Sequence, residues 1–206
     1  KKEIKRYFAS NIYVMNTMVG YILMVAAAIG LAAAGMDKLE SYLQLEGGGG
    51  TLPVSLGSML PFLLSLMVMM GGTTSSSISI EGKQWWIPRS LPIPSGLILD
   101  GKMLVNLTFA VPSILLAGTI LTVSGQTGGL RPVWVFLVPL AYACFSSVLG
   151  ITINLKMPVF NWDNETTVVK QSASTFVSVL GGMLLALVPI GLRFALAGVP
   201  ADLFLG

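Results

Sequence analysis

The sequence predicts an all-α membrane protein, a polytopic bundle of transmembrane helices forming a single domain over residues 1–206. Two observations support this class. The 206 residues are 54% hydrophobic and only 10% charged, with a mean hydropathy of +0.81, so there are too few charges to cover a water-exposed surface. The apolar residues also lie in long runs without alternation, which favours helices over barrel strands because each helix satisfies its own backbone in lipid.

Five apolar runs approach the roughly 20 residues that a helix needs to cross a bilayer core about 30 Å thick. They cover residues 12–34, 52–70, 103–123, 133–153 and 175–196. A sixth run begins at Leu203, where the sequence stops, and the sequence opens on lysine without an initiator Met. We therefore expect five full spans, a truncated sixth, and a chain that is part of a longer protein.

Prolines and short polar connections punctuate these runs. Pro61, Pro112, Pro139 and Pro189 lie inside runs, where each removes a backbone hydrogen bond and favours a bend. Residues 1–13 mix basic and aromatic side chains and predict an amphipathic helix on the membrane surface. Residues 37–46 predict a second interfacial helix, followed by a flexible glycine run at 47–50.

The basic residues predict the orientation. With the N-terminus in the cytoplasm, nine lysines and arginines face the cytoplasm and three, Lys38, Arg131 and Arg193, lie toward the outer side. These cations are scattered at segment ends, whereas nucleic-acid binding would require a clustered basic stripe. We expect Arg193, inside the last run, to extend its side chain to the outer interface, with a substrate contact as the alternative.

The residue inventory excludes several chemistries. The chain has no His and one Cys, Cys144, so it cannot build a serine–histidine–aspartate triad, a His or Cys metal cluster or an internal disulfide. It contains no phosphate-binding loop, and no run has a carboxylate near its centre. We therefore expect no enzyme activity, no cofactor and no bound metal, and any ATP hydrolysis must occur on another chain.

The richest non-apolar segment is residues 73–102, which lies on the cytoplasmic side in this topology. Its centre carries mixed charges, prolines and the pair Trp85 and Trp86. A short amphipathic helix here could present a tryptophan to a partner protein, because Trp and Arg often anchor interfaces. Alternatively, the two tryptophans belong to an interfacial aromatic belt.

This segment resembles a known family. Residues 81–93 read E-G-K-Q-W-W-I-P-R-S-L-P-I and are similar to the E-G-K-x-x-W-I-x-[KR]-S-L-P-[IV] segment of bacterial ABC-2-type exporter permeases. Two other stretches also resemble that group. One is residues 160–165 with 168–172, and the other is residues 2–8, which are similar to the start of the second half of these permeases. The resemblance covers most of the chain, with Trp85 at a position where an aliphatic residue is expected and Pro88 shortening the helix.

The resemblance implies a permease without a nucleotide site that works with a separate ATP-binding cassette subunit. Family members commonly have about twice as many spans, so this chain corresponds to the C-terminal half and would pair with a second permease half or a homodimer mate. It implies a multi-pass protein of the bacterial inner membrane and a coupling helix between the second and third spans. The candidate coupling residues are Glu81, Gly82, Lys83, Trp85, Trp86, Arg89 and Leu91.

The resulting hypothesis is the membrane-spanning subunit of an ATP-driven exporter, with a lipid-like, peptide or hydrophobic cargo favoured over an ion. The alternative is a non-transporting membrane scaffold or assembly protein, which docks a partner without energy coupling.

In the second cytoplasmic connection, residues 154–171, we expect Asp163 or Asn161 to cap a helix that begins near Glu165.

Overall fold

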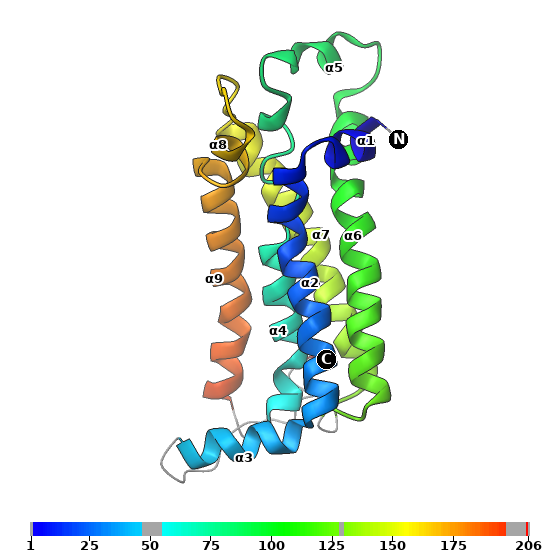
Figure 1. Ribbon diagram of the computed structural model, residues 1–206, viewed down its shortest axis with the longest axis vertical. Helices are drawn as coiled ribbons and strands as arrows, with labels where there is room; N and C mark the ends of the chain where they lie inside the picture. The colour runs from blue at the N-terminus through cyan, green and yellow to red at the C-terminus, as the bar shows by residue number, and fades with distance from the viewer. Residues whose placement is uncertain (1, 47–54, 128–129, 197–204, 206) are drawn as a thin grey trace.

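The chain forms a bundle of long helices with short helices across both ends (Figure 1). The computed structural model describes residues 2–46, 55–127, 130–196 and 205, and these residues contain helices and no strands. The long helices are α2 (Asn11–Ala34), α6 (Ser95–Val123), α7 (Pro132–Lys156) and α9 (Ala173–Ala195), and α4 (Leu56–Met70) is shorter. The all-α prediction is therefore confirmed for the described residues.

Four stretches are long and apolar enough to cross a membrane, where the sequence predicted five spans. They are α2, α6, α7 and the stretch Glu165–Ala195, which contains α9. The predicted span 52–70 instead yields α4, whose 15 residues would extend only about 23 Å. Residues 52–54 of that run and the predicted sixth span's start at residue 203 lie outside the described residues. The structure thus supports a membrane protein, with four full-length candidate spans and one short apolar helix.

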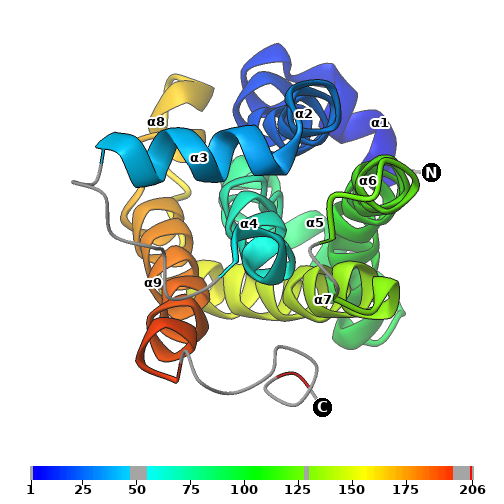
Figure 2. The ribbon, with the colours of Figure 1, turned by 90° about the horizontal axis from the view of Figure 1, so that it is seen from below.

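Helix α4 lies in the middle of the bundle, with α2, α6, α7 and α9 around it (Figure 2). It packs against α2, α7 and α9, and it contributes the side chains of Leu60, Leu64 and Val68 to the core. The α2 contact is very close: a Cβ atom on Gly20 would lie 2.5 Å from the carbonyl oxygen of Met67. Because any larger side chain would force the helices apart, the small residue at position 20 fixes this contact.

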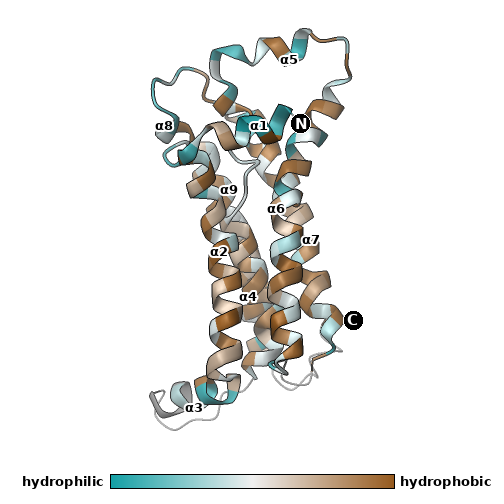
Figure 3. Cartoon of the chain, turned by 45° about the vertical axis from the view of Figure 1, so that its right-hand side comes forward, coloured by the Kyte–Doolittle hydropathy of each residue, from teal (hydrophilic) through white to brown (hydrophobic). Residues whose placement is uncertain are grey.

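The short helices lie at the two ends of the bundle, where the hydrophilic residues gather (Figure 3). One end carries α1 (Lys2–Ala9), α5 (Trp86–Ser90) and α8 (Glu165–Val169), and the other carries α3 (Met36–Glu46). The predicted helices at 1–13 and 37–46 are thus present as α1 and α3. The α4–α6 and α7–α9 connections lie at the same end as α1, in agreement with the relative topology expected from the runs.

Two helices extend beyond their predicted ends. Helix α6 begins at Ser95, eight residues before the predicted start at Met103, so the last part of segment 73–102 is helical. Helix α7 continues to Lys156. Arg193 lies in the last turn of α9, where its guanidinium donates a hydrogen bond to the carbonyl of Leu196 at 3.1 Å. The four prolines predicted to lie inside spans all lie inside helices.

Candidate functional site

After α4 ends at Met70, the chain continues through the bundle without regular α-helix. Residues 73–79, which we call the polar segment, contain two threonines, four serines and Ile78, and are buried throughout. They lead into the 3₁₀ helix η1 (Ser79–Gln84). Irregular backbone at this depth is stable only where protein groups satisfy its amides and carbonyls. Two asparagines from neighbouring long helices accept hydrogen bonds from three of its amides.

Asn106 of α6 binds the beginning of the polar segment. Its side-chain oxygen accepts hydrogen bonds from the Thr73 amide at 2.9 Å and from the Tyr21 hydroxyl at 3.0 Å. Its side-chain nitrogen donates to the hydroxyls of Ser147 at 2.9 Å and Ser146 at 3.3 Å. Asn106 is fully buried, so these bonds offset the cost of removing its amide from water.

Asn154 of α7 binds the end of the polar segment in the same way. Its oxygen accepts from the amides of Ile78 at 2.9 Å and Ser79 at 3.1 Å, and its nitrogen donates to the Ser79 hydroxyl at 2.8 Å. The same nitrogen donates to Ser174 of α9, and the Trp162 indole donates to the Ser79 carbonyl at 2.8 Å. The polar segment is therefore held by Asn106 of α6, Asn154 of α7 and Trp162, while Ser174 of α9 positions Asn154.

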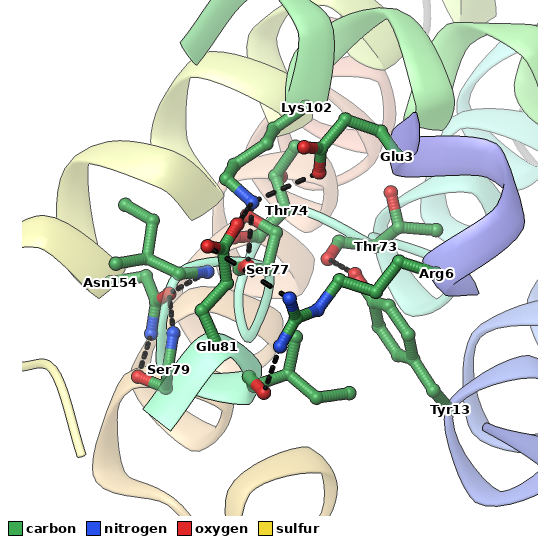
Figure 4. Close-up of polar contacts among 12 residues, drawn as sticks. Glu3, Arg6, Tyr13, Thr73, Thr74, Ser77, Ser79, Glu81, Lys102 and Asn154 are labelled. Atoms are coloured by element: carbon green, nitrogen blue, oxygen red, sulfur yellow. Dashed lines mark hydrogen bonds and ion pairs between the residues drawn. The ribbon is translucent and has the colours of Figure 1, made fainter. Parts of the chain in front are cut away.

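Four charged residues form a cluster where the polar segment meets η1, two of them buried and two partly exposed (Figure 4). We call Glu3, Arg6, Glu81 and Lys102 the charged cluster. The Lys102 ammonium contacts Glu81, lies 3.0 Å from Glu3 and donates to the Ser77 carbonyl at 3.0 Å. Arg6 donates to the Ile80 carbonyl at 2.9 Å, and its guanidinium lies 4.0 Å from the second Glu81 oxygen.

Burial makes the charged cluster a strong constraint on this end of the bundle. Lys102 is 2% exposed and Glu81 is 3% exposed, so each charge has little access to water. Two cations and two anions balance one another, which offsets part of the desolvation cost. The cluster joins α1 to η1 and α6, which both lie far from α1 in the sequence. Burial also raises the pKa of Tyr7 in α1, whose hydroxyl forms a hydrogen bond with the Thr17 hydroxyl at 2.7 Å.

Beyond the cluster, the chain projects from the bundle and exposes apolar side chains. We call residues 86–93 the tip; it contains α5 and lies at the far end of the molecule in Figure 1. Trp86 is 67% exposed and Leu91 is 46% exposed, and Ile87 and Ile93 are also exposed. A group of exposed large apolar residues rimmed by charge is typical of a protein or membrane contact.

The seven predicted coupling residues thus divide into two sets. Glu81 and Gly82 are buried at the base of the tip, whereas Lys83, Trp86, Arg89 and Leu91 are exposed. Trp85 lies between the sets, with its ring centroid 5.7 Å from the Lys102 ammonium. The coupling helix expected over residues 81–91 is not continuous. The structure has η1 and the five-residue α5 there, and the backbone at Gly82 is not helical.

Gly82 is required by its backbone conformation and its surroundings. Its φ of +55° falls in the left-handed region that residues with a Cβ disfavour. An added Cβ would also lie 3.1 Å from the Trp162 indole nitrogen. The turn at Gly82 directs the chain out of the bundle, and so it sets where the tip begins.

Several residues that build this site were not among the predicted ones. Lys102 and Arg6 were counted among the cytoplasmic basic residues and Glu3 lay in the predicted surface helix 1–13, because sequence position alone does not show ion pairing over such separations. Asn106 gave a usable signal, since an amide within an apolar run needs a buried partner, whereas Asn154 was placed in the connection 154–171 and lies inside α7. The predicted cap of α8 was wrong: Asn164, and neither Asp163 nor Asn161, accepts the hydrogen bond from the Thr166 amide at 2.9 Å.

The chain was compared with protein-family models, curated proteins and solved structures, and no match was found. Within the described ranges, no group of three or more acidic, histidine or cysteine residues is placed to hold a metal ion.

Proposed function

We propose that this chain is the membrane-spanning permease subunit of an ATP-driven exporter of the ABC-2 type, and that the tip is its contact with a separate ATP-binding cassette subunit. One observation carries the proposal. The exposed apolar tip is attached through Gly82 to the charged cluster, which ties it to α1 and α6. A partner that moves the tip would therefore displace helices of the bundle.

The chemistry of the tip supports a protein partner. Trp86 and Leu91 offer apolar area, and Arg89 and Lys83 offer charged groups beside it. Tryptophan and arginine are the residue types most enriched among interface residues that dominate binding free energy. The resemblance of residues 81–93 to the exporter permeases favours an ATPase as that partner. The basic residues at this end then favour a topology in which the tip lies on the cytoplasmic side of the bacterial inner membrane.

The test is co-purification of the full-length protein, tagged and expressed in its native membranes, followed by assay of ATP hydrolysis by the purified complex. We expect Trp86→Ala and Leu91→Ala to reduce the bound ATPase subunit by about 30-fold or more, the factor for a loss of about 2 kcal/mol. Both side chains are exposed, so the bundle should fold normally. Tyr42→Ala on α3, which removes a 66% exposed aromatic at the opposite end, should leave the complex intact.

The alternative function is a membrane scaffold or assembly protein, because an exposed apolar tip also fits docking without energy coupling. A partner that depends on Trp86 but hydrolyses no ATP would support the scaffold. Retention of an active ATPase by both tip variants would contradict the assignment of the tip as the coupling contact.

A further inference from the structure

A groove on the side of the bundle lies between α2 and α9. It has a volume of about 460 Å³, and its walls include Val19 of α2 and Val179 and Leu180 of α9. Met70, the last residue of α4, also lines it. The side chains of Val19, Met70 and Leu180 are exposed, so α2, α4 and α9 each contribute an exposed apolar side chain to the groove. Helix α4 packs against both α2 and α9, so it forms the floor between them.

One end of the groove is polar and basic. Lys170 follows α8 and lines this end together with Asn16 and Thr175. The Asn16 amide donates to the Val169 carbonyl at 3.3 Å, which attaches the α8 connection to α2 directly beside the groove. Lys170 is exposed and forms no ion pair with any residue that the structure describes. Its ammonium is therefore available to an anion from outside the chain.

The polar and apolar parts of the groove follow the depth profile of a bilayer. Lys170 lies just before α9 begins at Ala173, whereas Leu180 lies about 10 Å further along that helix. On α2, Val19 lies about 12 Å from the helix start at Asn11. A cation at headgroup level above an apolar groove at acyl-chain level matches the two halves of a phospholipid.

We propose that this groove binds a phospholipid of the surrounding bilayer with a negatively charged headgroup. One acyl chain lies between α2 and α9 over Met70, and the headgroup phosphate contacts Lys170. The occupant is a lipid because the walls are apolar along the depth of the leaflet, and the headgroup is anionic because the free cation at the rim complements it. This site is independent of the tip and of the proposed ATPase contact.

The test is native mass spectrometry of the full-length protein in detergent, titrated with phosphatidylglycerol or with phosphatidylcholine of the same acyl chains. We expect a preference of about fivefold for phosphatidylglycerol, the factor that corresponds to about 1 kcal/mol for one lysine near anionic lipid. Lys170→Gln should abolish this preference. Lys156→Gln, which removes an exposed lysine at the end of α7 outside the groove, should preserve it.

A second variant tests the acyl-chain part of the site. Val179→Trp fills the groove and should weaken binding of both lipids while the protein stays folded, because Val179 is only half-buried. Equal binding of the two lipids to the wild type, or an unchanged preference in Lys170→Gln, would overturn the proposal. Displacement of bound phosphatidylglycerol by inorganic phosphate alone would also overturn it, because the acyl chain would then contribute nothing.

Discussion

Replacing Lys102 by Met should destabilise the bundle strongly. The substitution conserves the length of the side chain but leaves Glu81 buried, 3% exposed, without its closest cation. Breaking a buried ion pair by removing one partner costs about 3–5 kcal/mol. Arg6 lies 4.0 Å away on a partly exposed side chain and compensates only in part, so we expect about 3 kcal/mol.

The measurement is thermal unfolding of the full-length protein in detergent. A loss of about 3 kcal/mol should lower Tm by about 6–12 °C for a chain of this size. Lys38→Met, on the exposed surface of α3, is the matched control and should change stability by less than about 0.5 kcal/mol.

The double variant Lys102→Met, Glu81→Met separates the ion pair from the packing. With both charges removed, no uncompensated charge remains in the interior, and we expect most of the lost stability to return. Glu3 retains partial exposure and can be solvated. A wild-type Tm for Lys102→Met alone, or a double variant less stable than the single one, would refute the assignment of a buried and energetically coupled cluster.

Three further substitutions test the elements that position the tip, each by the same thermal assay. Asn106→Leu leaves several buried donors and acceptors without partners and should cost about 2–4 kcal/mol; no loss would mean that these groups are solvated. Gly82→Ala should cost about 1–2 kcal/mol, because Gly82 has a positive φ and lies against the Trp162 ring. Gly96→Ala, in open space within α6, is the control and should be neutral or stabilising. Equal effects of the two substitutions would contradict a requirement for glycine at position 82. Asn164→Ala should cost about 0.5–2 kcal/mol, because the α8 cap is lost, and an unchanged Tm would argue against that cap.

Hydropathy was sufficient to place the long helices. Helices α2, α7 and α9 begin and end within three residues of the predicted runs, because burial in lipid or in the bundle selects uniformly apolar sequence. The first turns of α6 were missed since Ser95, Asp100 and Lys102 lower the local hydropathy, although a helix can extend beyond the apolar layer.

The predicted span 52–70 shows where local sequence is insufficient. Its helix ends at Met70, and the following polar residues stay inside the bundle because Asn106 and Asn154 bind their backbone from helices distant in the sequence. Such pairing depends on tertiary contact, which hydropathy does not report. For the same reason, only part of the candidate site was predicted. The pattern at 81–93 indicated the exposed tip, whereas the ion pairs at its base depend on tertiary contacts.

The dependence of the polar segment on two later helices has a consequence for biogenesis. Asn106 and Asn154 follow the polar segment in the chain, so they leave the ribosome after it. Until α6 and α7 have entered the membrane, the amides of Thr73, Ile78 and Ser79 lack the partners that they have in the finished protein. Until then, the polar segment must stay hydrated or be shielded by the insertion machinery, and it can take its final place only after α6 and α7 are inserted.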